Sequence, residues 1–469
     1  MRILYVLRGE GYFSYHDTVI HHLCAAGHQV KILFDEEHGR VKLNPEIQTN
    51  MDQEANLSRG EVVRRSDHWR RILYASRELR SYSSYLNRPE QSAFYTDRWE
   101  NYIAGFLKPV VRRSRVARKL VASCFSRSVM QGFEQLVPPD KKIIQVIQQF
   151  RPDVIVASPA NLRFSEELDY IKAGKALHIP TAISVLSWDN LTTKGIFQVI
   201  PDVLLTWNQA QAEEAIQIHR VPSEQIVITG SPFFDKWIDG DRLQMDRQSF
   251  FRKVTLNPDQ PYLLYLGSSK NIAEDETWQV KELLDCIRAH PDPQVRRIQI
   301  LVRPHPSNVE ICSAIQDEGV QVWPKGRTMM GTVDFWQDFY NSMKYSFGTV
   351  GINTTGMIDA VINDRPGAAI MSERYRLTQM QSMHFCQLLK ANVLEIAESA
   401  PACVEVLRDM LVGIDRKKAE RSRFIHDFVR PHGLARPAGY YAALAITLAA
   451  QGKTAANINS MLGAEDIGS

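Results

Sequence analysis

The chain lacks several features that would assign it to a class of protein at once. Its six cysteines form no CxxC pair and no Cys/His ligand spacing, which argues against a disulfide framework and against a structural zinc site. No apolar run reaches the roughly 18 residues that a membrane span needs, and the longest, YYAALAITLAA at 440–450, predicts a packed helix. The opening MRILYVLRGEGYF predicts a buried strand and a loop, not a secretion signal. We therefore expect a cytoplasmic protein, within reach of the inner face of the membrane.

No large excess of one charge exists either, since the formal net charge of the 469 residues is only +3. The charge is nevertheless uneven, because residues 59–127 hold sixteen Lys or Arg against six Asp or Glu. A basic stretch of this kind permits nucleic-acid binding, but the sequence shows no recognition motif for it. We do not expect a nucleic acid as a partner.

The composition is that of a soluble globular protein, with 44% hydrophobic and 23% charged residues. A chain of 469 residues is too long for one ordinary core, so two domains of roughly 200 residues each are expected.

Short apolar runs alternate with helical patterns through most of the chain, which is typical of βαβ units and a parallel sheet. The strands predicted for a first doubly wound domain, residues 1–240, lie at 2–7, 29–34, 153–158, 181–187, 202–207 and 225–230. Residues 50–130 do not fit the alternation, because they are polar, Arg-rich and aromatic. They predict a helical insertion in this domain.

A second series of the same kind predicts a second domain, residues 241–430. Its predicted strands lie at 262–267, 298–303, 320–323 and 345–350, and its predicted helices at 278–290 and 333–344. By analogy, we expect the helices of residues 431–469 to pack back on the first domain. The predicted fold class is α/β, with two Rossmann-like doubly wound domains that face a cleft and a helical insertion in the first.

Ligands of open parallel sheets bind beyond the carboxyl ends of the strands. After the first predicted strand stand Glu10 and, further on, His16; after the predicted strand at 181–187 stands Asp189 in the loop WDNLTTKG. These side chains are candidates for the base that activates an acceptor. The alternative for Asp189 is an Asx-turn that caps backbone amides.

Two further strand ends carry turns of small residues. Gly230 and Ser231 follow one strand, and Gly267, Ser268 and Ser269 follow another. Such turns present backbone N–H groups to an anion, although turns of this kind also occur without a ligand.

The segment GINTTGMIDA follows the predicted strand at 345–350 and opens a helix. Thr354, Thr355 and Gly356 fall in its first turn, where free N–H groups and the helix dipole attract phosphate. Asp359 lies one helical turn further on. The alternative is plain N-capping by threonine, which needs no ligand.

The strand at 298–303 ends in the sequence RPHP. Pro304 fixes the chain as it leaves the sheet, so that Arg303 and His305 project around the turn. A structural histidine is the simpler interpretation. Together with the threonines of the neighbouring helix, however, the pair predicts a site for a diphosphate, with Arg303 as cation and His305 as proton donor to a departing phosphate oxygen.

RPHP followed by GINTTGMIDA resembles the paired His-Pro and Ser/Thr motifs of bacterial capsule and surface-polysaccharide transferases of the GT-B fold. The resemblance implies that His305, Thr354 and Thr355 contact the phosphate of a nucleotide-activated donor of UDP or CMP type. In many enzymes of the GT-B fold the acid of this helix is Glu, and here Asp359 would take its place. It also implies a glycan or lipid-linked acceptor on the first domain, no cofactor and no metal, and no DxD motif appears in a loop where a metal-dependent enzyme would carry one.

Two other functions stay open from the sequence. A sugar-nucleotide epimerase of the same fold requires several carboxylates in its site, and the sequence offers few. A non-catalytic binding protein on a GT-B-like scaffold requires none. For a transferase we expect the base to come from the first domain, with His16 and Asp189 ahead of Glu10.

Within the basic stretch, residues 110–125 (VVRRSRVARKLVASCF) alternate Arg and Lys with Val, Leu and Phe. The pattern predicts an amphipathic cationic helix. One interpretation is a solvated face that packs on its own domain. The other is a surface that docks on anionic lipid, where a lipid-linked acceptor would be found.

Overall fold

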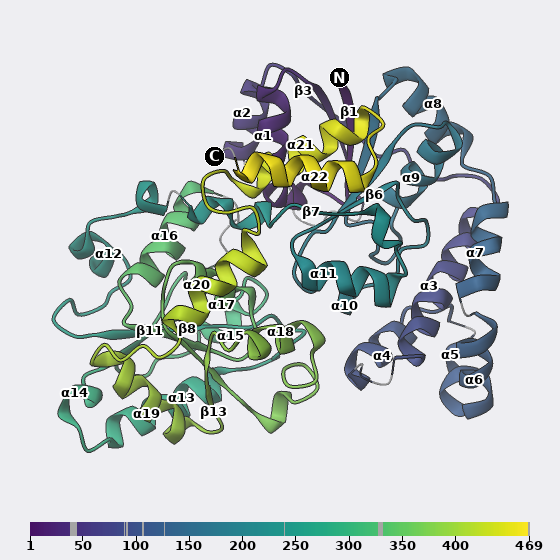
Figure 1. The fold of residues 1–469 in the computed structure, drawn as a ribbon. Helices are drawn as coiled ribbons and strands as arrows, with labels where there is room; N and C mark the ends of the chain where they lie inside the picture. The colour runs from purple at the N-terminus through teal and green to yellow at the C-terminus, as the bar shows by residue number, and fades with distance from the viewer. Residues whose placement is uncertain are drawn as a thin grey trace. The chain divides into compact units, whose positions relative to one another are not determined.

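The computed structural model of the chain describes residues 1–37, 45–88, 90, 92–105, 107–125, 127–238, 240–326 and 332–467. It divides into two compact units (Figure 1): Met1–Asp235 with His426–Ser469, and Lys236–Ile425. The first unit therefore ends about five residues before the predicted boundary at 240, and the chain returns to it about five residues before 431.

The first unit contains a parallel sheet of seven strands in the order β3-β2-β1-β4-β5-β6-β7. The strands are β1 Arg2–Leu7, β2 Gln29–Phe34, β3 Leu57–Glu61, β4 Val154–Ser158, β5 Thr181–Ser184, β6 Val203–Thr206 and β7 Ile226–Ile228. Six of them coincide with predicted strands. The edge strand β3, with sequence LSRGE, was missed because its polar residues show no apolar run. Since β3 belongs to the sheet, the helical insertion begins after it and not at residue 50 as predicted.

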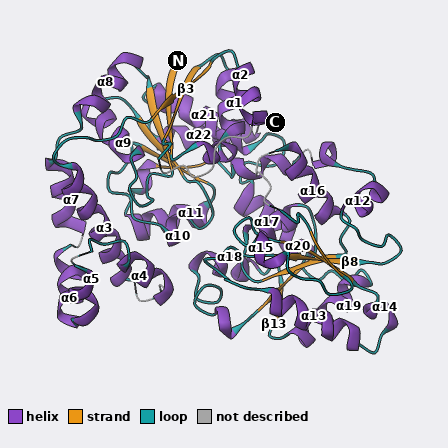
Figure 2. Cartoon of the chain, turned by 180° about the vertical axis from the view of Figure 1, so that it is seen from behind, coloured by secondary structure: helices purple, strands orange, loops and turns teal. Residues whose placement is uncertain are grey.

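Alternate side chains of β1 enter two different cores, as the pleat of a strand requires. Ile3, Tyr5 and Leu7 pack with α1 (Asp17–Ala25), α21 (Ala438–Ala450) and α22 (Ala455–Ile467). Leu4 and Val6 pack on the other face with α8 (Lys141–Phe150) and α9 (Glu167–Ala176). Figure 2 shows the strands between these two groups of helices. The last two helices thus complete the core of the first unit.

The remaining helices of the first unit lie in the insertion, beside β3 and after the later strands. They are α2 Pro45–Gln53, α3 Arg70–Leu86, α4 Ala93–Glu100, α5 Lys108–Arg113, α6 Arg115–Cys124, α7 Arg127–Leu136, α10 Asn190–Thr193 and α11 Gln209–Glu214. Figure 1 shows α4, α5 and α6 together at one end of the insertion, away from the strands of this unit.

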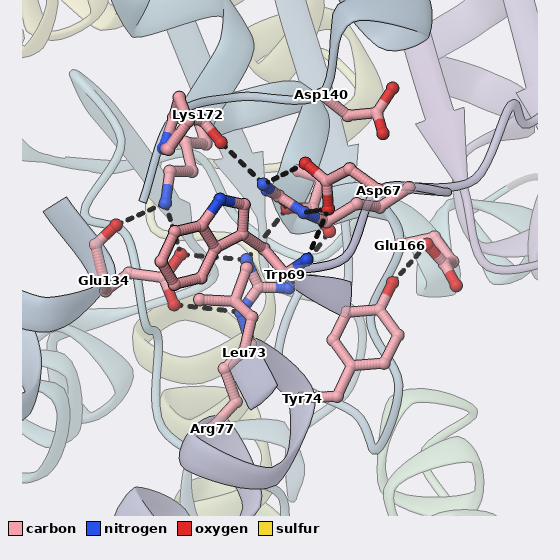
Figure 3. Close-up of polar contacts among 12 residues, drawn as sticks. Asp67, Trp69, Leu73, Tyr74, Arg77, Glu134, Asp140, Glu166 and Lys172 are labelled. Carbon is pink, nitrogen blue, oxygen red and sulfur yellow. Dashed lines mark hydrogen bonds and ion pairs between the residues drawn. The ribbon is translucent and has the colours of Figure 1, made fainter. Parts of the chain in front are cut away.

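A buried network of charges holds the insertion to the sheet-covering helix α9 (Figure 3). Arg77 of α3 donates to Glu134 of α7 at 3.0 and 2.9 Å and to Asp169 of α9 at 3.1 and 3.0 Å. Lys172 reaches the same Glu134 carboxylate at 3.0 Å. Burial disfavours the charge of Glu134, but Arg77 and Lys172 outweigh it and lower its pKa to about 2. Removal of one partner of such a buried pair costs about 3–5 kcal/mol, so this network fixes the insertion in place.

The predicted single helix at 110–125 is in fact two helices. Ser114 separates α5 from α6 with an extended backbone (φ −120°, ψ 111°), and its side chain accepts a hydrogen bond from the Ala117 N–H at 3.2 Å. The prediction missed this break because an N-cap serine inside an amphipathic run disturbs the apolar period very little.

The second unit contains a parallel sheet of six strands in the order β10-β9-β8-β11-β12-β13. The strands are β8 Tyr262–Leu266, β9 Gln299–Arg303, β10 Val320–Val322, β11 Gly348–Gly351, β12 Gly367–Ile370 and β13 Glu395–Ala397. The helices are α12 Arg247–Lys253, α13 Thr277–Ala289, α14 Pro293–Arg296, α15 Val309–Cys312, α16 Val333–Lys344, α17 Thr355–Ile362, α18 Met383–Ala391, α19 Ala400–Leu411 and α20 Lys418–Phe424. Two short strands, β12 and β13, were not predicted.

Among the residues that the structure describes, no helix combines the length and the apolar character that are needed to cross a membrane.

Candidate functional site

The candidate site lies in the second unit, where the chain leaves the carboxyl ends of β8, β9 and β11. Gly267 follows β8 and donates its N–H to the Arg303 carbonyl at 2.9 Å. A Cβ at this position would lie 3.2 Å from the Arg303 oxygen, the Pro304 Cα and the His305 nitrogen. A side chain here would therefore push the exits of β8 and β9 apart by a few tenths of an ångström, and glycine lets them touch.

Ser268 joins all three strand exits. Its carbonyl accepts from the Asn308 side chain at 3.0 Å, beyond β9, and its hydroxyl accepts from the Asn353 N–H at 3.3 Å, beyond β11. Its own N–H donates to Glu276 at 2.8 Å. Ser268 is fully buried, so it positions the three strand exits without being exposed to a ligand itself. Ser269 is half-buried and Lys270 is exposed.

Hydrogen bonds select one tautomer of His305. The Ser307 N–H donates to Nδ1 at 3.1 Å, and the Ser307 hydroxyl lies 2.9 Å from the same atom. Because the Ser307 N–H makes Nδ1 an acceptor, the Ser307 hydroxyl donates its own hydrogen to Nδ1 while it accepts from the Lys270 N–H at 3.1 Å. A nitrogen that accepts cannot carry the proton of a neutral imidazole, so Nε2 carries it.

The imidazole of His305 is also neutral at physiological pH. Desolvation by the surrounding protein lowers its pKa to about 4. The free protein thus offers a hydrogen-bond donor at Nε2 rather than a cation. The sequence predicted that His305 donates a proton, and in the free protein this role is limited to the donation of a hydrogen bond. An anion bound beside the ring would favour the charged form and raise this pKa again.

The first turn of α17 follows β11, at the same edge of the sheet as His305, with β8 between β9 and β11. Thr354 is the N-cap, with extended backbone (φ −151°, ψ 150°), and its hydroxyl accepts from the Gly356 N–H at 3.4 Å. Thr354 and Thr355 are both half-buried. The N-cap interpretation of Thr354 is therefore present in the structure: Thr354 engages the N–H groups of Gly356 and Met357, and the helix dipole is what the first turn keeps to favour an anion.

Arg303 does not project around the turn beside His305. It is buried, with its guanidinium 4.8 Å from the centre of the Phe339 ring and with Nη1 donating to the Ser342 hydroxyl of α16 at 3.2 Å. Burial lowers its pKa to about 10. The last residue of a strand alternates in direction with its neighbours, and here that direction is the core, which the prediction did not take into account.

Asp359 also points into the protein. It is 4% exposed, and the Trp237 indole N–H donates to it at 2.6 Å. Desolvation raises its pKa to about 6, against the opposing effects of Lys236 and of the Trp237 bond. In this structure the acid of α17 is therefore a partner of Trp237 and is almost entirely buried.

The candidates of the first unit are mostly engaged in local structure. His16 is 1% exposed; Nδ1 lies 3.1 Å from the Tyr5 hydroxyl and Nε2 lies 2.9 Å from the Ser158 hydroxyl. Burial lowers its pKa to about 3. The geometry is that of a structural histidine beneath the carboxyl edge of the sheet.

Asp189 is engaged by neighbouring side chains and not by the Asx-turn that was its alternative, because its carboxylate makes no capping bond to α10. One carboxylate oxygen accepts from the Ser187 hydroxyl at 2.6 Å, and the other accepts from the Thr193 hydroxyl at 2.9 Å and from Lys194 at 3.0 Å. Glu10 is half-buried in the 3-10 turn Glu10–Tyr15 that follows β1.

The turn at Gly230 and Ser231 is covered by the returning chain. Gly230 has φ +82°, and a Cβ there would lie 2.9 Å from the Val429 oxygen. The Ser231 N–H donates to this same carbonyl at 2.9 Å, and the Gly230 N–H donates to the Trp207 carbonyl at 3.0 Å. Both N–H groups are therefore used, which contradicts the anion site predicted from the turn.

Sequence reasoning missed two buried carboxyl groups of the first unit. Glu78 of α3 accepts from the Phe164 N–H at 3.4 Å and lines a small pocket together with Asn161 and Gln198. Glu167 opens α9, and no side chain of the described residues donates a hydrogen bond to its carboxylate oxygens. Desolvation raises the pKa of each to about 7. Both stand in polar stretches that resemble a solvated helix face, and only long-range packing buries them.

Comparison with known proteins finds no family model and no curated protein that matches the sequence. Solved structures do match. A putative UDP-N-acetylglucosamine 2-epimerase from Listeria monocytogenes aligns with TM-score 0.53 and 9% identity over 96% of this chain and 95% of its own. S. aureus MnaA in a co-structure with UDP aligns with TM-score 0.51 and 11% identity over 95% and 96%. A glycosyltransferase from Rickettsia africae gives TM-score 0.49 and 11% identity over 92% and 94%.

The chain has the GT-B fold. At these identities the likeness concerns the fold alone, with its two Rossmann-like α/β domains.

Proposed function

We propose that the protein is a glycosyltransferase that moves a sugar from a nucleotide-activated donor to a glycan or lipid-linked acceptor in cell-surface polysaccharide synthesis. The observation that carries the proposal is the arrangement around Ser268: its hydrogen bonds to Asn308 and Asn353 tie the exit of β9, which carries His305, to the exit of β11, which leads into α17. An N–H donor and a helix N-terminus are the groups that bind a diphosphate.

In the proposed reaction the bond between the sugar C1 and the donor phosphate oxygen breaks, and its electron pair stays on that oxygen. His305 and the α17 turn stabilise the negative charge that develops there. The acceptor hydroxyl forms the new bond to C1 and gives its proton to a carboxylate base. Glu10 remains a proposed base, and the pocket position of Glu78 adds a second one.

We propose that the reaction needs no metal ion. In the parts of the chain that the structure describes, no three His, Cys, Asp or Glu side chains come together as a ligand group. The helix dipole and the His305 donor would carry the phosphate charge instead. EDTA should therefore leave activity unchanged, and an activity that EDTA abolishes and Mg²⁺ restores would contradict this part of the proposal.

A second candidate function is epimerisation of a nucleotide sugar. Two observations favour it. Both of the reported structures that exceed TM-score 0.5 concern uridine nucleotides, one as a UDP-N-acetylglucosamine 2-epimerase and one with UDP in its co-structure. In addition, Glu78 and Glu167 have pKa values of about 7. Carboxyl groups with such pKa values are suited to remove and return a proton at neutral pH.

The test is a donor screen with UDP-, GDP-, CMP- and CDP-linked sugars, in which free nucleotide and sugar epimers are measured separately. Release of nucleotide that is lost in His305→Ala supports the transferase. An epimer that forms without release of nucleotide supports the epimerase. Binding of a nucleotide in calorimetry with no turnover of any kind would leave only a binding protein and overturn both enzyme proposals.

A further inference from the structure

The outward face of α5 and α6 exposes apolar side chains that a solvated surface does not need. The exposed fractions are 54% for Val110, 67% for Val116 and 55% for Leu120. The inner face of the same helices carries Val111 and Val121, which are buried against α3 and α4. The inner face alone therefore attaches these helices to the insertion.

The exposed residues of α6 form one stripe along the helix. At about 100° per residue, the stripe spans an arc of about 180°. Two cations occupy one edge of this arc, and the apolar side chains of Val116 and Leu120 lie towards the other. An apolar edge beside a cationic edge is the pattern of a helix that lies in a membrane interface. The exposed residues are Arg115, Val116, Lys119, Leu120, Ser123 and Cys124.

The charge of this segment has one sign. Residues 107–125 hold six Lys or Arg and no Asp or Glu. Arg112 and Arg118 pair with Glu100 of α4, each at 2.9 Å. The outward face thus keeps a net positive charge next to its apolar side chains. Among the described residues, no ion pair engages the other four cations, which are Lys108, Arg113, Arg115 and Lys119.

We infer that the outward face of α5 and α6 docks on an anionic lipid surface, with Val116 and Leu120 in the headgroup boundary and Arg115 and Lys119 against the lipid phosphates. Each cation near such a surface strengthens binding by about fivefold. A nucleic acid fits this face less well, because α5 and α6 expose aliphatic side chains rather than the aromatic rings on which bases stack. The inference stands apart from the proposed reaction, since it uses none of the residues of the donor site.

The experiment is sedimentation of the full chain with vesicles. We expect binding to phosphatidylcholine vesicles that contain about 30% phosphatidylglycerol, weak binding to pure phosphatidylcholine, and loss of binding between about 50 and 300 mM salt as screening increases. Arg115→Glu with Lys119→Glu should raise the apparent dissociation constant at least about tenfold. Val116→Ser with Leu120→Ser should weaken binding at low salt, because it removes the apolar side chains from the headgroup boundary.

Matched controls come from the second unit. Lys281→Glu with Arg423→Glu makes the same charge change at exposed positions of α13 and α20. Val412→Ser with Ile414→Ser removes side chains that are 59% and 45% exposed. Both controls should bind vesicles as the parent does, and thermal melting should show every variant to be folded.

Three outcomes would overturn the inference. The parent fails to sediment with anionic vesicles at low salt, or the α6 variants bind as well as their controls, or a single-stranded RNA binds the parent while anionic vesicles do not. Where the charge reversal lowers the melting temperature, neutralisation by Arg115→Gln with Lys119→Gln replaces it in the same comparison. None of these outcomes depends on donor turnover, so failure here leaves the proposed function to its own test.

Discussion

His16 and His305 occupy comparable places in the two units, each beyond a parallel strand, and their surroundings differ in one decisive respect. Both ring nitrogens of His16 have hydrogen-bond partners inside the first unit. In His305 the bonds from Ser307 engage Nδ1 alone. Burial lowers the pKa of both. The pKa therefore does not separate the two histidines, whereas the number of ring nitrogens with a hydrogen-bond partner does.

The largest effect should come from His305→Ala. Loss of a donor to the leaving phosphate should lower donor turnover by about 10²–10⁴-fold, with little change in the free energy of unfolding because the ring is partly exposed. Initial rates and thermal melting check this. If the variant unfolds, or if it turns over as the parent does, His305 is structural and the comparison with His16 fails.

Replacement of His16 should change the free energy of unfolding and its dependence on pH, rather than donor turnover. Its folded pKa of about 3 lies below the ordinary value of 6.5, so the unfolded chain binds the proton first as pH falls. The stabilisation is complete above about pH 6.5 and is lost towards pH 3, up to about 5 kcal/mol. His16→Gln should flatten this limb in denaturant unfolding at several pH values. A variant that loses activity while its pH-stability curve stays unchanged would instead make His16 the base.

The α17 turn should show a smaller effect, on donor affinity. Thr354→Val with Thr355→Val removes two hydroxyls near the proposed phosphate, each worth about 1.5–3 kcal/mol when bonded to a charge, so the donor dissociation constant should rise at least about tenfold. The loss of the Thr354 cap costs about 1 kcal/mol of stability. Thr354→Ser with Thr355→Ser keeps the hydroxyls and is the control. Equal constants for the two double variants in calorimetry would place the phosphate elsewhere.

The smallest effect should come from Ser307→Ala, which removes the hydroxyl but keeps the backbone N–H that points at Nδ1. Loss of one neutral hydrogen bond of about 1 kcal/mol should lower turnover by about fivefold. Ser313→Ala, a loss of a hydroxyl bonded to the Lys325 carbonyl, is the matched control. A fall of the same size in both variants would show that Ser307 does not orient His305.

The sequence predicts the fold well where strands are strongly apolar, as in RILYVL of β1 and YLLYL of β8. It fails at β3 (LSRGE), β12 (GAAI) and β13 (EIA). These strands are short or polar, and neighbouring strands rather than their own side chains place them in a sheet.

The candidate site can be predicted from the sequence only in part, because some of its contacts are local and others join residues far apart in the chain. The capping role of Thr354 follows from local sequence, and the structure shows it. The partner of His16 is Ser158, 142 residues away, and the partner of Asp359 is Trp237, 122 residues away. No local pattern contains such contacts, so the sequence did not show which candidate side chains are already engaged.

The most direct test of this account is ¹⁵N NMR of the histidine rings, titrated with pH and then with a nucleoside diphosphate. We expect His305 to be the Nε2–H tautomer with a pKa near 4 in the free protein, and we expect its pKa to rise and Nε2 to shift on binding. His16 should stay neutral and unshifted throughout. A nucleotide-dependent shift at His16 with none at His305 would contradict the central claim.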